Sequence, residues 1–331
     1  MKKLVKTREF SLVLIIVALC AVVSVVSPAF LQISNLTNII NNSIPTILLG
    51  CGMTMVIITC GIEVAVAAEM ICTAYIVGAI ALSQSGSLAL CLLAGLAGGL
   101  LMGVINGLLI AYLKVPPFIA TIGTQNMYRG LLLLITGSQW LMNLPDFITG
   151  LTRDKFLGLP WSVYITVALV AFTWWILRYT RFGRAVYAVG GNTEAAIRAG
   201  INVRRTLMLV YVYTGLMCGF AGLLNASRLG NIQPSGALHL EMTVVASVIL
   251  GGTSVLGGIG SPVGTVFGVI LMKIFENLLV LLYVPTYWQK FFEGALMILI
   301  IVVNVVQNAY ASRKKVRIDV DMEIPEGGVN A

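Results

Sequence analysis

Ten apolar segments, each 17 to 25 residues long, constrain the fold of this chain more than any other feature of its sequence. They lie between Pro, Gly and polar clusters, at residues 10–30, 44–60, 64–83, 88–112, 117–136, 161–179, 207–228, 242–260, 263–283 and 289–309. A helix of about 20 residues crosses the roughly 30 Å apolar core of a bilayer. The pattern therefore predicts an all-α integral membrane protein, a polytopic bundle of about ten transmembrane helices.

The composition excludes an ordinary soluble domain. Of the 331 residues, 58% are hydrophobic and 10% are charged, whereas soluble domains carry roughly 25% charged residues. The first apolar run follows a basic start and has no convincing cleavage site after it, which favours an uncleaved membrane helix over a signal peptide. We expect one membrane domain over residues 1–312 and a polar cytoplasmic tail over residues 313–331.

The charges predict how the chain is oriented. The formal net charge is +8, and the basic residues gather at the N-terminus, in a central loop and in the C-terminal tail. Lys and Arg in short loops resist translocation, so these three regions should be cytoplasmic. An alternating path through ten segments agrees, because it places both termini in the cytoplasm.

Glycine is concentrated near residue 255, in the stretch GGTSVLGGIGSPVG. Dense small residues permit close helix packing and non-helical backbone, which a membrane tolerates only where it is buried or lines a cavity. The stretch predicts a broken Gly-rich helix, whose residues are Gly251, Gly252, Gly257, Gly258, Gly260, Ser261 and Gly264.

The central basic loop, residues 180–206, has a readable local structure. Gly190 and Gly191 predict a turn, and Asn192 or Thr193 is a suitable cap for a short helix over residues 193–198. Such a helix, projecting into the cytoplasm between two membrane segments, would serve as a docking element.

The same loop carries a family resemblance. Residues 183–201, which include the run AVGGNTEAAIRAGI, resemble the coupling loop of the ribose and simple-sugar family of ABC importer permeases. SRLGNIQP (227–234) and VILGGTSVLGGIGSPVGTVFG (248–268) also resemble that family, as do KVPPFIATIGTQNMYRGL (114–131), more weakly, and INGLLI (105–110). The resemblance covers about residues 40–305.

The resemblance implies a permease subunit in the bacterial cytoplasmic membrane, forming the pathway for a pentose or hexose. Its implied partners are a cytoplasmic ABC ATPase, an extracytoplasmic sugar-binding protein and a second permease chain, identical or paralogous, within membrane lipid and without nucleic acid. The chain has no phosphate-binding GxxxxGK[ST] loop, catalytic pair or metal-ligand pattern. We therefore expect no enzyme activity, metal or cofactor in this chain, with ATP bound by the separate subunit. The residues implied to transmit the ATPase motion are Gly190, Gly191, Asn192, Glu194, Ala195, Ala196 and Gly200.

Polar residues inside apolar segments are costly and often mark a transport pathway. The candidates here are Glu63, Asn106, Thr124, Gln125, Asn126 and Arg129. Glu63 stands in GIEVAVA, where the family tends to have GIDLSVG, so no substrate contact is carried over to it; an interfacial position at a helix end is the alternative. Lys273 and Glu276 are three residues apart, which favours a structural ion pair.

Two other transporter classes stay open at this level. A related ABC importer for branched-chain amino acids has a similar coupling loop and a glycine-rich late helix. An ion-coupled secondary transporter would instead require a constellation of carboxylates near the membrane midplane and no docking loop.

Overall fold

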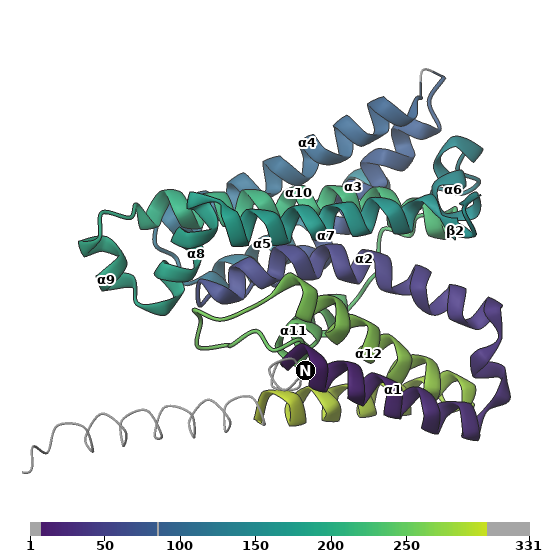
Figure 1. Cartoon of the computed structure of the whole chain (residues 1–331). Coiled ribbons are helices and arrows are strands. Elements are labelled where there is room, and N and C mark those ends of the chain that lie inside the picture. Colours follow the sequence, from purple (N-terminus) through teal and green to yellow (C-terminus); the bar gives the residue numbers. More distant parts are fainter. Residues whose placement is uncertain (1–7, 85, 303–331) are drawn as a thin grey trace, which may run out of the picture.

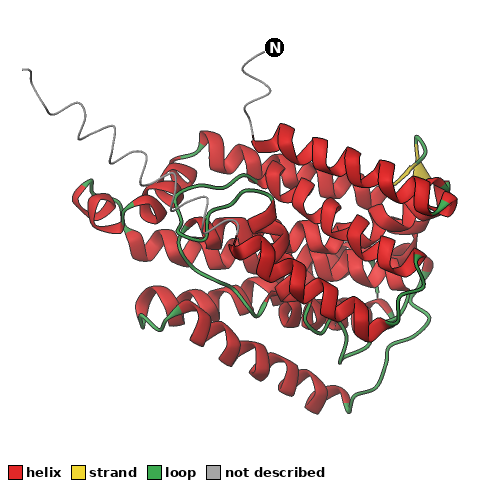
Figure 2. Cartoon of the chain, turned by 90° about the horizontal axis from the view of Figure 1, so that it is seen from below, coloured by secondary structure: helices red, strands yellow, loops and turns green. Residues whose placement is uncertain are grey.

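The computed structural model describes residues 8–84 and 86–302, which form an almost entirely helical bundle (Figures 1 and 2). The long helices are α1 (Arg8–Val26), α2 (Ile33–Ile58), α3 (Val66–Ala81), α4 (Leu88–Gly107), α5 (Pro117–Thr136), α7 (Trp161–Tyr179), α10 (Val203–Leu229), α11 (Leu240–Leu250) and α12 (Pro262–Leu281). Residues 286–302 are also helical. The predicted polar tail, residues 313–331, lies outside the described residues.

Short elements connect these helices. They are the 3-10 helix η2 (Pro28–Leu31), the π-helical turn η3 (Leu108–Tyr112) that continues α4, α6 (Asp146–Arg153), α8 (Arg181–Gly191), α9 (Thr193–Arg198), and the strands β1 (Lys155–Phe156) and β2 (Leu159–Pro160), which pair antiparallel. In Figure 1, α8 and α9 lie at one end of the bundle, and α6 with the strand pair lies at the other.

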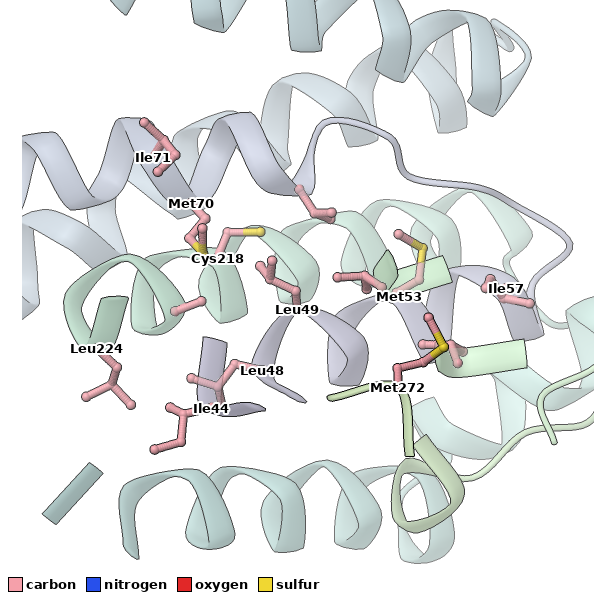
Figure 3. Close-up of a cluster of buried hydrophobic side chains, with 14 of the residues drawn as sticks. Ile44, Leu48, Leu49, Met53, Ile57, Met70, Ile71, Cys218, Leu224 and Met272 are labelled. Atoms are coloured by element: carbon pink, nitrogen blue, oxygen red, sulfur yellow. The ribbon is translucent and has the colours of Figure 1, made fainter. Parts of the chain in front are cut away.

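Helix α2 is the central element. Figure 1 shows it between a layer containing α3, α4 and α10 and a layer containing α1, α11 and α12. Its side chains form much of the main apolar cluster, in which Leu48, Leu49 and Met53 are fully buried and pack with Met272 of α12 (Figure 3). A helix covered on all sides needs no polar face for solvent, which explains why most of α2 is apolar.

Glycine allows α4 and α10 to pack backbone to backbone. A Cβ atom added to Gly99 would collide with the carbonyl oxygen of Gly215, and one added to Gly215 would collide with that of Gly99. Gly95 and Gly219 make a similar close approach one turn away. Small residues at such a contact are the usual means of helix association in lipid, where apolar side chains gain little by leaving their surroundings.

Five helical segments among the described residues are long and apolar enough to cross a membrane: α2, α4 with η3, α7, α10 and α12. Helices α1, α3 and α11 contribute shorter apolar stretches. The structure thus supports a helical, multi-pass membrane protein, whereas the number of about ten crossings stays a prediction.

The Gly-rich segment differs from one helix with a break in it. Helix α11 ends at Leu250, the next eleven residues are non-helical, and α12 begins at Pro262. A Cβ on Gly251 would lie 2.5 Å from the carbonyl oxygen of Gly264, and one on Gly268 would collide with that of Ser247. Contact at these two levels means that α11 and α12 run antiparallel against each other, so the glycines allow a hairpin of two packed helices.

The short helix predicted in the basic loop is present as α9, over residues 193–198. Asn192 caps it by accepting a hydrogen bond from the backbone N–H of Ala195 at 2.9 Å. The predicted turn at Gly190 and Gly191 is wrong, because both glycines lie in the last turn of α8. The turn falls one residue later, where Asn192 has extended backbone.

Candidate functional site

A polar cavity of about 740 Å³ lies between α2, α10, α12 and the loop that joins α10 to α11. Its lining is unusually rich in side-chain amides: Asn35, Asn38, Asn42, Asn225, Asn231, Gln233 and Asn277. Amides combine donors and acceptors without carrying charge. Such a lining suits a neutral solute with many hydroxyl groups.

Helix α2 supplies one stripe of this lining. Asn35, Asn38, Asn42 and Thr46 are spaced three and four residues apart, so they lie on one face of the helix. Asn35, Asn38 and Asn42 are not among the predicted pathway residues, because they precede the apolar segment that begins at residue 44. The helix extends back to Ile33, and the three-and-four spacing of the amides is the signal that would have identified them.

The cavity also contains a guanidinium held by amides. The Arg228 side chain donates hydrogen bonds to the amide oxygens of Asn42 and, at 3.3 Å, of Asn225. Its Nε is buried and has no hydrogen-bond partner among the described residues. Because a buried donor without a partner is costly, Arg228 is a natural donor for a solute hydroxyl or carbonyl oxygen.

Helix α12 contributes two pairs of side chains to the cavity lining, one within the helix and one shared with α2. Lys273 and Glu276 form the ion pair predicted from their spacing, with Nζ 2.7 Å from the carboxylate. Asn277 and Asn35 exchange two amide hydrogen bonds, of 2.8 and 3.0 Å, and so join α12 to α2. The pairing of the lysine with the glutamate leaves this wall without a net charge.

None of the six predicted pathway residues lines this cavity, and of the six the structure joins only Glu63 and Asn106 by a hydrogen bond. Arg129 comes closest: its guanidinium donates to the carbonyl oxygens of Gly236 and Ala237, at 3.0 and 3.2 Å, and these two residues do line the cavity. Arg129 thus positions the loop that joins α10 to α11. Arg129 therefore stabilises the cavity wall without lining the cavity itself.

Glu63 and Asn106 form a second, separate cluster with Glu69. The three side chains are at most 1% exposed. The Asn106 amide nitrogen lies 2.9 Å from a Glu69 oxygen and 3.3 Å from a Glu63 oxygen, so one side chain bridges both carboxylates. Glu63 lies in the short segment between the end of α2 and the start of α3, so it stands near a helix end, and it is buried within the protein. Glu69, an ionisable residue inside an apolar segment of the sequence, is the closest hydrogen-bond partner of Asn106.

The remaining three candidates on α5 do not converge on a common point. Thr124 is buried and donates to the carbonyl oxygen of Thr121 at 3.2 Å. Asn126 is exposed and donates to Ile122 of its own helix. Gln125 is half-buried. A helix places consecutive residues about 100° apart, so a run of polar residues does not form one wall.

The predicted coupling loop contacts the interior of the bundle through side chains, such as that of Val186 in a buried apolar cluster, and also through backbone. The N–H of Gly258, in the Gly-rich segment, donates to the carbonyl oxygen of Ile58, at the end of α2, over 2.9 Å. Gly190 of α8 lies against the same carbonyl so closely that a Cβ on Gly190 would overlap it. We call this meeting point of Ile58, Gly190 and Gly258 the glycine junction. It connects α8, α2 and the Gly-rich segment through backbone contacts, and beside them the Cys60 thiol donates to the carbonyl oxygens of Gly190 and Leu256, at 3.5 and 3.2 Å.

The outer part of the loop is arranged differently. Glu194 and Ala195 are exposed on α9, and Gly200 ends the helix with a positive φ of 79°. Ala196 is only 3% exposed, so of the two alanines predicted to allow close contact, only Ala195 presents its methyl group outward. Among residues 8–84 and 86–302, no cluster of three metal-ligating side chains occurs.

Sequence comparisons give these features a family context. Residues 35–301 match the family described as the branched-chain amino acid transport system / permease component. The autoinducer 2 import system permease protein LsrC of Klebsiella pneumoniae is 36% identical over 304 residues, which cover 92% of this chain and 88% of the relative. The protein of that name from Escherichia coli K12 / DH10B is 34% identical over 302 residues, covering 91% and 88%. No solved structure matches the chain.

Both kinds of match extend over most of the chain, and both name permeases of transport systems, which for the relatives are import systems. They agree with the resemblance carried by the basic loop and the Gly-rich segment. Permeases of this kind work with an ATPase and a binding protein. The chain therefore belongs to the branched-chain amino acid transport system / permease component family, as a sugar-type ABC importer permease of the multi-pass inner-membrane class.

Proposed function

We propose that the amide-lined cavity is the part of the translocation pathway that receives a simple sugar, a pentose or a hexose, from an extracytoplasmic binding protein. The main support for this proposal is the lining of the cavity. Seven side-chain amides and the guanidinium of Arg228, whose Nε has no partner among the described residues, surround a volume of about 740 Å³. Hydroxyl groups need many donors and acceptors and no compensating charge. A cavity of this volume is within the usual range for small-molecule sites.

The topology belongs to the same proposal. About ten helices cross the membrane within a single domain over residues 1–312, with both termini in the cytoplasm and the cavity toward the opposite side. Two permease chains line the pathway, and ATPase subunits, which alone bind ATP, dock on α9. ATP-driven movement of α9 and α8 then reaches α2 through the glycine junction and switches the bundle between outward-facing and inward-facing states.

The relatives favour one specific alternative substrate, since their names assign them to autoinducer 2 import. The family description favours a branched-chain amino acid. A zwitterion would require an accessible cation and an accessible anion, whereas Lys273 and Glu276 are already paired with each other. The cavity lining therefore supports a neutral, hydroxylated solute better than an amino acid.

The substrate is tested with the permease, its ATPase and its binding protein in proteoliposomes. Labelled pentoses and hexoses are compared with autoinducer 2 and leucine as substrates and as competitors. We expect sugar uptake that requires ATP on the side of the membrane where the ATPase subunits are bound. Uptake of leucine alone, or uptake that follows an ion gradient without ATP, contradicts the proposal.

The cavity is tested with a matched pair of variants. Asn38 lines the cavity and its side chain makes no hydrogen bond to the described residues, so Asn38→Leu removes a solute contact and leaves the internal contacts intact. The loss of one hydrogen bond of about 0.5–1.5 kcal/mol lowers sugar uptake about twofold to twelvefold at low concentration. Asn126→Leu, at an exposed position outside the cavity, is the control. Equal sugar uptake by the Asn38→Leu and Asn126→Leu variants would show that the cavity is not part of the translocation pathway.

ATPase docking is tested at Ala195, the exposed alanine of α9. Ala195→Glu adds bulk and charge where close contact is expected, so the ATPase should no longer co-purify. Gln84→Glu adds a similar charge in the exposed turn between α3 and α4 and should have no effect. Normal co-purification of the Ala195→Glu variant would show that docking does not use α9.

A further inference from the structure

An apolar groove of about 540 Å³ runs along the outside of the bundle between α2, α7 and α12. Its walls are formed by branched apolar side chains, among them Ile40, Ile47, Val163, Val170, Val266 and Ile270. It is separate from the amide-lined cavity, although Ile39 of α2 borders both.

The two hydroxyl side chains in this groove do not make it polar. Ser43 donates to the carbonyl oxygen of Ile39, and Thr166 donates to that of Ser162, each at 2.7 Å. Both hydroxyl groups are therefore satisfied within their own helices. The groove offers its occupant only hydrocarbon contact.

The groove has the length of one membrane leaflet. From Val163 to Trp174 on α7 it covers eleven helical steps, or about 16 Å at 1.5 Å per residue. The hydrocarbon core of a bilayer is about 30 Å thick, so half of it is about 15 Å. A single acyl chain of that length would therefore fill the groove, lying along most of α7 with one end near Val163 and the other at Trp174.

At Trp174 the groove meets a second, polar pocket of about 400 Å³. Trp174 borders both, and Pro262 in this pocket is followed in the chain by Val263 in the groove. The described residues that line the pocket include Arg178 and Arg184 and no acidic residue. Neither arginine forms an ion pair within the part of the chain that the structure describes.

The surroundings of the arginines leave their charge available. Arg184 donates to the carbonyl oxygen of Tyr179 at 3.3 Å, and the Tyr187 hydroxyl is engaged with the carbonyl oxygen of Gly260 at 2.8 Å. Helix α12 begins in this pocket, with Ser261 as its N-cap, so the positive end of its dipole points the same way as the arginines. Every charged element of the pocket favours an anion.

We propose that the groove and the polar pocket together form a binding site for one anionic phospholipid. An acyl chain lies along α7 between α2 and α12, and the phosphate lies between Arg178 and Arg184. The basic pocket favours a lipid over a helix of a partner protein. An apolar helix in the groove would place apolar side chains next to Arg178 and Arg184 and would leave their charges without an anion. With the orientation proposed above, the lipid belongs to the cytoplasmic leaflet.

The site is tested by native mass spectrometry of the intact permease, delipidated in neutral detergent and titrated with phosphatidylglycerol or phosphatidylcholine. One phosphatidylglycerol should bind tightly, and phosphatidylcholine should bind at least tenfold more weakly. Arg178→Ala with Arg184→Ala should weaken phosphatidylglycerol about 30-fold, since each basic side chain near an anionic headgroup contributes about 1 kcal/mol. The control is Arg204→Ala with Arg205→Ala, which removes the same charge from exposed positions outside the pocket.

A second variant tests the groove independently of charge. Val167 lines the groove and is 61% exposed, so Val167→Phe fills part of it without disturbing the core. This variant should also weaken phosphatidylglycerol, and glycerol phosphate, which lacks a chain, should not compete. The proposal is overturned if the two lipids bind equally, or if the two double arginine variants lose the same affinity for phosphatidylglycerol. It is also overturned if Val167→Phe has no effect on that affinity, or if glycerol phosphate competes fully. None of these outcomes depends on transport, so the site and the proposed function can fail separately.

Discussion

The glycine junction gives the sharpest prediction about how this permease is built. In Gly190→Ala the new Cβ would lie 2.7 Å from the carbonyl carbon of Ile58 and 2.9 Å from the backbone nitrogen of Gly258. Ordinary contacts of a Cβ begin near 3.4 Å, and the carbonyl oxygen of Ile58 lies closer than either of these atoms, so α8 must withdraw by more than about 0.7 Å. Neither neighbour is a side chain that can rotate away, because both contacts are with backbone.

The cost follows from this displacement. Overpacking a tight contact costs about 1–3 kcal/mol. If Gly258 is pushed from Ile58 by a similar amount, their hydrogen bond, now 2.9 Å, exceeds the usable range, and a further cost of about 0.5–1.5 kcal/mol is added. The total is about 2–4 kcal/mol. Gly191→Ala is the matched control, because a Cβ on the adjacent glycine has nothing within 4 Å.

The two variants are compared in thermal unfolding in one detergent and in ATP-dependent uptake in proteoliposomes. Gly190→Ala should unfold at a clearly lower temperature than Gly191→Ala. If the junction also carries the ATPase movement, uptake per ATP hydrolysed should fall in Gly190→Ala alone. Indistinguishable stability and uptake of the two alanine variants would refute the reasoning, because they differ only in what the added methyl group meets.

Three further predictions concern buried or half-buried polar groups, each measured as a shift in thermal unfolding. Asn106→Leu leaves two buried carboxylates without their shared donor and should destabilise the protein by about 2–3 kcal/mol, whereas Asn126→Leu should change little. Lys273→Met should cost more than the double variant Lys273→Met with Glu276→Met, because an unpaired charge in a half-buried position is worse than no charge; the opposite order would contradict the assigned pair. Arg129→Met should release the loop between α10 and α11 and lose about 1.5–3 kcal/mol, and a neutral result would show that the two carbonyl contacts are unimportant.

The sequence was informative where one local rule decides the structure. Apolar length placed the long helices, because a helix in lipid satisfies its own backbone. Asn192 predicted the start of α9, since an N-cap interaction involves only a few successive residues. Lys273 and Glu276 were paired correctly because residues three apart share a helix face.

The candidate site was harder to find, because it depends on which helices become neighbours. The cavity combines amides from α2, α10 and α12, and only the stripe on α2 has a spacing visible in the sequence. Arg129 had a suitable chemistry for a pathway, but the loop that it supports lies more than 100 residues away. Burial of Glu63 beside Glu69 likewise follows from the packing of α4, through Asn106, against the start of α3.

The polar cavity has a further consequence for how solutes enter it. Two of its three strong cations, Lys273 and Lys290, are paired with Glu276 and Glu293, which leaves Arg228 as the one strong cation there without an acidic partner among the described residues. A nearly neutral entrance exerts little long-range attraction on ions, so ionic strength has little to screen. The passage of a solute through this cavity should therefore be almost indifferent to salt.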